Sequence, residues 1–524
     1  MRPRHSLFFV AFFALLVGLP LTADWPTTEK VDLDAVYRIK DEGLQRSKVM
    51  EIASYLTDVY GPRLTGSPNI KEAADWAQKT MNEWGLANVH REGFPFGRGW
   101  LNHRFVALAL TPRAYPLVGY PEAWTPGTNG LVTGEAVMVD IQSDGDFAKF
   151  RGTLQGKFVF ITSLREVQAH FEAPAHRFTD AELADLAKQP RARGRGNFQD
   201  SQDGRARVAL EQKKRQFWFD EGVAAVVQTS RGDGGTFFVV GQLPDPKVGP
   251  STPRVILAVE HYGRIARTLE KKIPVTLQMD IDNKFYDDDL NAFNIVAEIP
   301  GSDKSDEIVM IGAHFDSWHS GTGATDNAAG SAIMMEAMRI LKTTGLRPRR
   351  AVRLALWGGE EEGHFGSIAY VQAHFADRVT TQLKPEHAKL SVYFNLDNGT
   401  GTIRGVYLQG NESVAPIFQN WMEPFKNLGM STLAIRGTGG TDHTSFDAVG
   451  LPGFQFIQDP VEYDSRTHHS NQDVYERLQA DDMVHNAVII AAFAYSAANR
   501  EDRLPRKPLP QARPTGRGAA NQQP

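Results

Sequence analysis

Residues 308–341, IVMIGAHFDSWHSGTGATDNAAGSAIMMEAMRIL, decide the fold of this chain. The stretch opens with the apolar run 308–311, which is typical of a buried strand, and it ends with apolar residues at helical spacing. A glycine-rich loop between them carries His314, Asp316, His319 and Asp326. Ligands of open α/β sheets collect where strands end and loops begin, so this loop predicts a binding site. A metal site is the first hypothesis.

Composition limits what such a site can contain. The chain has 524 residues, which favours two or three domains. It is 41% hydrophobic and 23% charged with a net charge of −5, so it lacks the basic excess that nucleic acid binding requires. The absence of cysteine excludes disulfides, a thiol nucleophile and thiolate ligands. A metal would therefore be held by His, Asp and Glu.

The N-terminus has the pattern of a secretory signal peptide. Arg2 and Arg4 precede the apolar run 7–19, which is shorter than the roughly 20 residues that span a bilayer. Cleavage after Ala23 is predicted, giving a secreted or periplasmic protein with no stable membrane insertion after cleavage. An uncleaved anchor is the alternative.

The first half of the chain carries few signs of chemistry. Helices are predicted over 32–59 and 70–84, with GPRLTGSP at 61–68 between them, followed by a strand over 89–96. We interpret this part as scaffold. From about residue 116 short strands and turns follow. The charged stretch 172–215 predicts a solvated, partly disordered insertion, with a basic docking patch as the alternative.

The second half alternates strands and helices, as in an α/β fold with a largely parallel sheet. Strands are predicted at 308–313, 351–357, 391–396, 404–408 and 453–457, and helices at 328–343, 366–375, 412–428 and 480–498. The polar residues 500–524 predict a disordered tail. The predicted organisation is a signal peptide (1–23), an N-terminal part of the catalytic domain (24–117), a β-rich insertion (118–280), the main catalytic part (281–499) and the tail (500–524).

Four further loops supply acids or imidazoles after apolar strands. Their sequences are GGEEEG at 358–363, DNG at 397–399, TDHTSF at 441–446 and THHSNQD at 467–473. Each is weak evidence alone, since glutamate runs and paired histidines are common on surfaces. Carboxylates buried at several strand ends are costly unless a cation neutralises them. Together these loops favour a metal site.

These residues resemble the di-zinc exopeptidase family that includes bacterial leucyl aminopeptidases and plasma glutamate carboxypeptidase. The matching stretches are AHFDSW, GATDNAAG, LALWGGEEEG, YFNLDNGTG, GGTDHTSF and HHSNQD, which spread over 308–473 in the family's order, and GPRLTGSP also fits. The resemblance implies a mixed, mostly parallel sheet flanked by helices. The middle segment resembles the protease-associated domain that such enzymes often carry as an insertion.

The resemblance also implies a site with two zinc ions per chain. His314 and Asp397 would hold one zinc, Glu361 and His469 the other, and Asp326 would bridge both. Glu360 would be the general base, acting on a water between the metals. Asp316 would orient the imidazole of His314. This chain has Asn327 where the family usually has a second aspartate, which leaves the loop conformation open.

The residues leave some assignments open. Glu361 as base and Glu362 as ligand is the other reading of the glutamate run, and His468 is the other candidate for the late histidine ligand. Asp442 and His443 either shape the substrate pocket or stabilise their loop. His319, His364 and His374 are interpreted as surface or pocket-wall residues.

The predicted function is an exported zinc aminopeptidase that acts on peptides or dipeptides. A carboxypeptidase or dipeptidase of the same chemistry is the first alternative. A single-zinc glutaminyl cyclase and a non-catalytic, receptor-like binding protein are the others. The predicted partner is a peptide substrate rather than nucleic acid or membrane, and a homodimer is possible.

Overall fold

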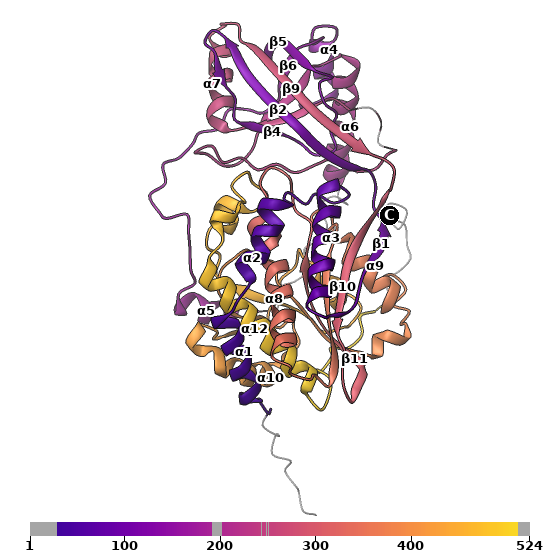
Figure 1. Ribbon diagram of the computed structural model, residues 1–524. Coiled ribbons are helices and arrows are strands. Elements are labelled where there is room, and N and C mark those ends of the chain that lie inside the picture. Colours follow the sequence, from indigo (N-terminus) through magenta and orange to yellow (C-terminus); the bar gives the residue numbers. More distant parts are fainter. Residues whose placement is uncertain (1–28, 191–201, 243, 248, 250, 512–524) are drawn as a thin grey trace, which may run out of the picture.

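The computed structural model describes residues 29–511 except 191–201, 243, 248 and 250. The chain forms two eight-stranded sheets, one above the other in Figure 1. The predicted signal peptide lies outside the described residues. No helix in the described part of the chain is long and apolar enough to cross a membrane.

The lower sheet is mixed and carries the predicted strands. In spatial order its strands are β1 (Ala87–Pro95), β10 (Asn291–Ile299), β12 (Arg350–Trp357), β11 (Lys304–His314), β13 (Leu390–Asn395), β16 (Gly453–Gln458), β14 (Ile403–Tyr407) and β15 (Thr432–Ala434). The central strands β12, β11, β13 and β16 run parallel. Their carboxyl ends therefore meet at one edge, which confirms the predicted α/β class.

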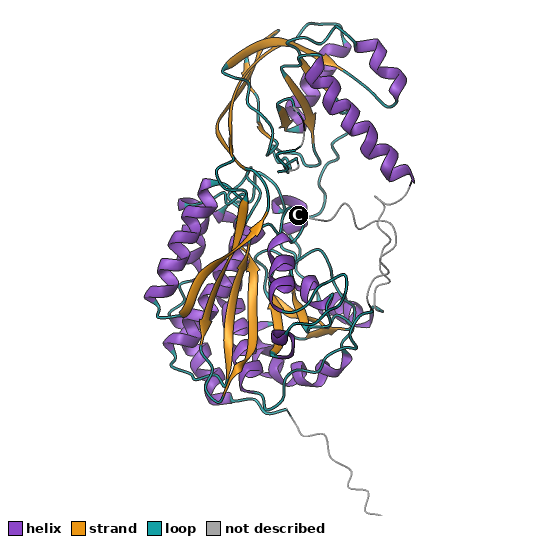
Figure 2. Ribbon diagram, turned by 90° about the vertical axis from the view of Figure 1, so that its right-hand side faces the viewer, coloured by secondary structure: helices purple, strands orange, loops and turns teal. Residues whose placement is uncertain are grey.

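Helices cover both faces of this sheet, as Figure 2 shows. One face packs against α1 (Leu33–Gln45), α2 (Val49–Ser54), α3 (Pro68–Glu83), α8 (Ala329–Thr343), α10 (Ala415–Met422) and α12 (Ala480–Asn499). The other packs against α9 (Phe365–His374) and α11 (His443–Asp447). Alternate residues of β11 serve the two faces: Val309 and Ile311 join the first core, and Ile308 and Met310 the second.

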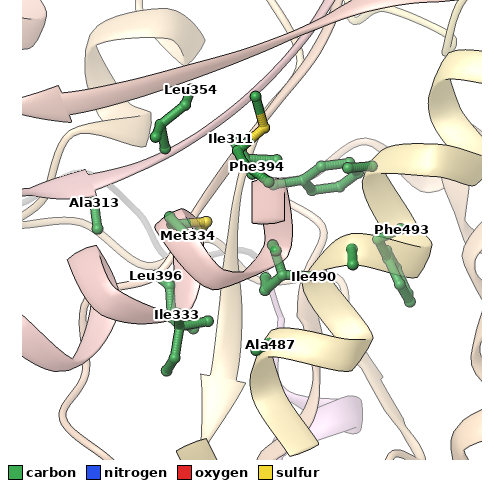
Figure 3. Close-up of a cluster of buried hydrophobic side chains, with 14 of the residues drawn as sticks. Ile311, Ala313, Ile333, Met334, Leu354, Phe394, Leu396, Ala487, Ile490 and Phe493 are labelled. Carbon is green, nitrogen blue, oxygen red and sulfur yellow. The ribbon is translucent and has the colours of Figure 1, made fainter. Parts of the chain in front are cut away.

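The larger core fixes α8 against the centre of the sheet. In Figure 3, Ile333 and Met334 of α8 lie among Ile311, Phe394 and Ile490, which come from β11, β13 and α12. Small residues at the start of α8 allow a close approach to the sheet edge. A side chain at Gly330 would meet the Leu396 carbonyl oxygen at 2.4 Å. The helix therefore sets the position of the loop that precedes it.

The upper sheet belongs to a second unit, here called the second-sheet unit. Its strands, in spatial order, are β3 (Tyr115–Pro116), β2 (Gly99–Thr111), β9 (Thr276–Tyr286), β5 (Leu131–Met138), β6 (Phe158–Phe160), β7 (Ala225–Thr229), β8 (Arg254–Leu257) and β4 (Gly119–Pro121), and its helices are α4 (Phe147–Phe150), α6 (Gln202–Asp220) and α7 (Val259–Glu270). The chain enters this unit after β1 and leaves it before β10. Strands β2 and β3 of this unit lie before residue 118, the predicted start of the insertion, and β9 runs past its predicted end at residue 280.

Two polar segments differ from their predictions. Within the stretch 172–215, α5 (Asp180–Lys188) buries Leu183 and Leu186 against Ala434 of the catalytic sheet. The predicted tail makes contacts in its described part: Leu504 is 2% exposed, and Arg506 donates to the carbonyl oxygens of His387 and Leu390. A disordered tail from residue 500 is therefore wrong for 500–511, because one apolar side chain and several arginines find partners. Residues 512–524 lie outside the described part.

Candidate metal centre

His314 stands at the carboxyl end of β11 and is fully buried. Its Nε2 lies 3.2 Å from Oδ1 of Asp326 and 3.2 Å from Oδ1 of Asp397. Asp326 lies in the segment Ala324–Ala328 (η4) that leads into α8, and its own backbone is not helical (φ −131°, ψ 84°). Asp397 follows the end of β13. The sheet edge thus brings together three of the predicted ligands from positions up to 83 residues apart.

Two more predicted ligands meet on the other side of Asp326. His469 Nε2 lies 2.9 Å from Oε2 of Glu361 and 3.3 Å from Oδ2 of Asp326. Asp326 therefore directs one carboxylate oxygen at His314 and the other at His469. This is the arrangement that a shared ligand between two metal ions requires.

The donor set suits metal ions. Three groups have ligand atoms within 4.8 Å of one another: His314, Glu360 and Asp397; His314, Asp326 and Glu361; and Asp326, His468 and His469. Oδ2 of Asp326 is buried and accepts no hydrogen bond within the described residues. A buried carboxylate oxygen without a donor is costly unless a cation faces it. Imidazole and carboxylate donors without thiolate fit zinc that keeps an open coordination position.

Electrostatics at the site reflect its concentration of acids. Burial, aided by the charge of Asp326, raises the pKa of Glu361 well above its usual range. Burial lowers the pKa of His314, but the charges of Asp397 and Glu360 outweigh this effect and raise that pKa well above its usual range. Both shifts favour the protonated forms of these groups, an effect that bound cations would oppose.

Glu360 precedes Glu361 but its carboxylate points elsewhere. Its Oε1 lies 3.2 Å from Nε2 of His364, and its Oε2 lies 4.0 Å from Nε2 of His314. Burial raises the pKa of Glu360 well above its usual range, against the opposing charge of His314. Glu362 belongs to none of the three ligand groups among the described residues. The geometry therefore favours Glu360 and Glu361 as the functional pair.

Asp316 supports the glutamate loop as well as His314. Its carboxylate accepts the backbone N–H groups of Glu360 and Glu361, each at 3.3 Å, and the Thr65 hydroxyl at 3.0 Å. Nδ1 of His314 lies 3.1 Å from the Asp316 carbonyl oxygen and 3.7 Å from its carboxylate. The backbone of Asp316 is therefore closer to the imidazole than the predicted carboxylate, which instead fixes the adjacent loop.

Arg63 is a site residue that sequence reasoning missed. It is fully buried, and its guanidinium donates to the carbonyl oxygens of Leu56 (2.6 Å), Phe315 (2.8 Å), Gly323 (2.9 Å) and Thr322 (3.0 Å). Burial lowers its pKa to about 10. Each carbonyl left without a donor would cost roughly 1–3 kcal/mol. Segment 61–68 is thus part of the site, and its match to the family pattern was the available signal.

Two further residues fix the loop around Asp326. The Asp473 carboxylate accepts the backbone N–H groups of Thr325 at 2.6 Å and Asp326 at 3.2 Å. Asn327 accepts the N–H of Gly330 at 2.8 Å and donates to the Leu396 carbonyl at 2.9 Å. An aspartate at this position could accept but not donate. Asn327 therefore ties α8 to the residue before Asp397 without removing a ligand.

A cavity of 430 Å³ opens over the cluster. It is lined by Asp326, Glu360, Glu361, Gly363, His364, Asp397, Asn398, Thr438, Gly439, Gly440, Thr441, Tyr463, Asp464, His468 and His469. His468 stacks on Tyr463 with ring centroids 4.7 Å apart, and its Nε2 is 3.8 Å from Asp326, farther than that of His469. The geometry therefore favours His469 over His468 as the ligand.

The remaining predicted residues lie in different surroundings. Asp442 and His443 are fully buried and do not line the cavity. Nε2 of His443 lies 3.0 Å from the Thr438 carbonyl oxygen, which favours the loop-stabilising role for His443. Burial raises the pKa of Asp442 to about 8. His319 is buried rather than on the surface, with Nε2 2.8 Å from the Pro121 carbonyl oxygen, and His374 pairs with Glu92 at 2.9 Å.

Carboxylates and imidazoles that meet at the carboxyl edge of a helix-covered mixed sheet form a site that suits metal-dependent hydrolysis. Residues 294–494 match the model of Peptidase family M28.

Relatives match well beyond this domain. Bovine Carboxypeptidase Q is 27% identical over 466 residues, covering 88% of each chain. The solved Peptidase M28 precursor from Shewanella amazonensis aligns with a TM-score of 0.64 at 24% identity, covering 91% of this chain and 98% of that one. BSAP, a zinc aminopeptidase from Bacillus subtilis, aligns with a TM-score of 0.54 at 19% identity, covering 86% and 95%. The structural matches support the two-unit fold, and the sequence matches support the peptidase class.

Proposed function

We propose that this enzyme is an exported aminopeptidase that removes residues from the free amino end of short peptides. His314 and Asp397 would hold one zinc ion, Glu361 and His469 would hold the other, and Asp326 would be shared by both. When bound, such a pair of ions polarises the scissile carbonyl and lowers the pKa of the attacking water. The resident ligands thus set where the peptide carbonyl lies.

Glu360 moves the proton in this proposal. Its carboxylate lines the cavity, where it lies near His364 and His314, and it is not one of the proposed zinc ligands. It can therefore accept a proton from the attacking water and return it to the leaving amine. A raised pKa suits an acid that must both accept and donate near neutral pH. Asp316 holds the Glu360 backbone and thereby orients this carboxylate.

The charge of the cavity wall supports the amino end as the recognised one. Asp464 is the acid of the described cavity lining that the metal centre does not use, and that lining contains no Lys or Arg. An ammonium group would find the Asp464 carboxylate there, whereas a peptide carboxylate would find no Lys or Arg. The charges of Arg231 and Arg378 influence the pKa values of His469 and His364 from outside the lining.

A carboxypeptidase or dipeptidase is the second candidate, and the similarity to bovine Carboxypeptidase Q over 88% of the chain favours it. Three forms of one peptide separate the two: free at both ends, N-acetylated and C-amidated. We expect N-acetylation to lower kcat/KM about 100-fold or more and C-amidation to change it only a few-fold, because a site built for a polar group rejects the analogue lacking it. A larger loss on C-amidation would instead establish the second candidate.

Export is proposed from the basic and apolar pattern of residues 2–23. N-terminal sequencing of protein recovered outside the cytoplasm of its producing cell is expected to begin at Asp24. A mature protein that retains Met1 would contradict the cleavable signal peptide.

A further inference from the structure

Two short segments, one from the second-sheet unit and one from the catalytic domain, meet beside the metal centre. One is the bridging segment, residues 235–239, which follows β7 in the second-sheet unit. The other is the ligand loop, residues 469–471, which carries His469. The Val239 N–H donates to the His469 carbonyl at 3.0 Å, and Phe238 and Ser470 form an isolated antiparallel bridge. The two units are therefore joined by backbone hydrogen bonds at a proposed zinc ligand.

Asn471 completes this junction with three hydrogen bonds. Its backbone N–H donates to the Phe237 carbonyl at 3.1 Å, and its Oδ1 accepts the Phe237 N–H at 2.9 Å. Its Nδ2 donates to the Gly235 carbonyl at 3.1 Å. Only a side-chain amide offers a donor and an acceptor in this geometry. The side chain thus holds the bridging segment at two backbone positions.

His469 needs external support because regular structure does not hold it. It follows the π-helical turn η8 (Tyr463–Thr467) rather than a strand, and its φ of 64° is in the left-handed region. This conformation costs a residue with a Cβ roughly 1–2 kcal/mol. From its own domain, the loop is held by Ser470. Its N–H donates to the Thr467 carbonyl at 3.0 Å, its hydroxyl donates to the Arg466 carbonyl, and its carbonyl accepts the Asp473 N–H at 3.2 Å. The remaining restraint on the His469 carbonyl comes from Val239.

We propose that Asn471 is a positioning residue for the zinc ion held by Glu361 and His469, and that the bridging segment completes this half of the metal centre. The inference rests on the proposed role of His469 as a ligand. The half containing His314 and Asp397 has no such dependence, because β11 and β13 position those residues directly. Loss of the junction should therefore weaken the binding of one zinc ion and leave the binding of the other unchanged.

The test measures the affinity of both zinc ions in the full chain by competition with a chromophoric chelator. In Asn471→Ala, affinity for one zinc should fall about tenfold, the lower end of the effect of losing an outer partner, while the other is unchanged. Asn471→Asp keeps the acceptor for the Phe237 N–H and should recover part of the loss. Gln472→Ala is the matched control: its side chain faces Arg477 rather than the bridging segment, so it should match the wild type.

His469→Ala separates the two levels of the proposal. This variant should lose one zinc equivalent outright. If it keeps both, the ligand assignment is wrong and the inference falls with it. If it loses one while Asn471→Ala binds both as tightly as the wild type, only the positioning role is overturned. Equal weakening of both zinc ions in Asn471→Ala would also overturn it, because that is the result of a general loss of structure.

Discussion

Glu360→Gln should lower kcat about 10²- to 10⁴-fold while both zinc ions remain bound. Glutamine fills the same space but cannot accept the proton of the attacking water. Glu360 belongs to the same ligand-distance group as His314 and Asp397, yet its Oε2 is 4.0 Å from His314 Nε2, whereas Asp397 Oδ1 is 3.2 Å from that nitrogen. Steady-state kinetics and zinc content of the purified variant provide the measurement.

Glu362→Gln is the matched control for this prediction. It makes the same chemical change two residues away, in the same loop, on a carboxyl group outside the three ligand groups. We expect activity within a few-fold of the wild type. The opposite result, an active Glu360→Gln together with zinc loss in Glu362→Gln, would assign both roles one residue later. Glu361 would then be the base and Glu362 the zinc ligand.

Asp326→Ala should abolish turnover and weaken the binding of both zinc ions. Its carboxylate oxygens lie 3.2 Å from His314 and 3.3 Å from His469, so a single substitution removes a donor from both halves of the site. The loss of affinity should exceed the roughly 10–100-fold that follows removal of an outer partner. Zinc content after dialysis against a fixed free zinc concentration is the measurement.

His469→Ala is the reference for the Asp326 prediction, since it should remove one zinc only. A variant Asp326→Ala that retains one tightly bound zinc would show that this carboxylate serves a single metal. The bridging assignment would then fail, while the roles of His314, Asp397 and Glu361 would not depend on it.

The parts of the site predictable from sequence are those that strand ends determine. His314, Glu361 and Asp397 follow the parallel strands β11, β12 and β13, whose carboxyl ends must share one edge. Apolar patterning also located the helices that cover the sheet. His469 was different: no strand places it, its loop stood out only by its paired histidines, and the resemblance to a family gave it the role of a ligand.

The missed residues act across long distances in sequence. Arg63 and Thr65 contact residues more than 250 positions later. Apart from its match to the family pattern, their segment shows only as a break between helices. The bridging segment meets Asn471 across a separation of 234 residues. The spacing of hydrophobic residues and short local motifs do not predict contacts between segments so far apart in the sequence. The tail prediction failed for 500–511 for a related reason: composition does not reveal that Leu504 has a site in the core.

The central claim is that one carboxylate, that of Asp326, joins two zinc sites. Anomalous diffraction at the zinc absorption edge, from crystals of the wild-type enzyme grown with zinc, tests it most directly. The account predicts two peaks on either side of Asp326, one beside His314 and Asp397 and the other beside Glu361 and His469. A single peak, or a second peak away from Asp326, would contradict it.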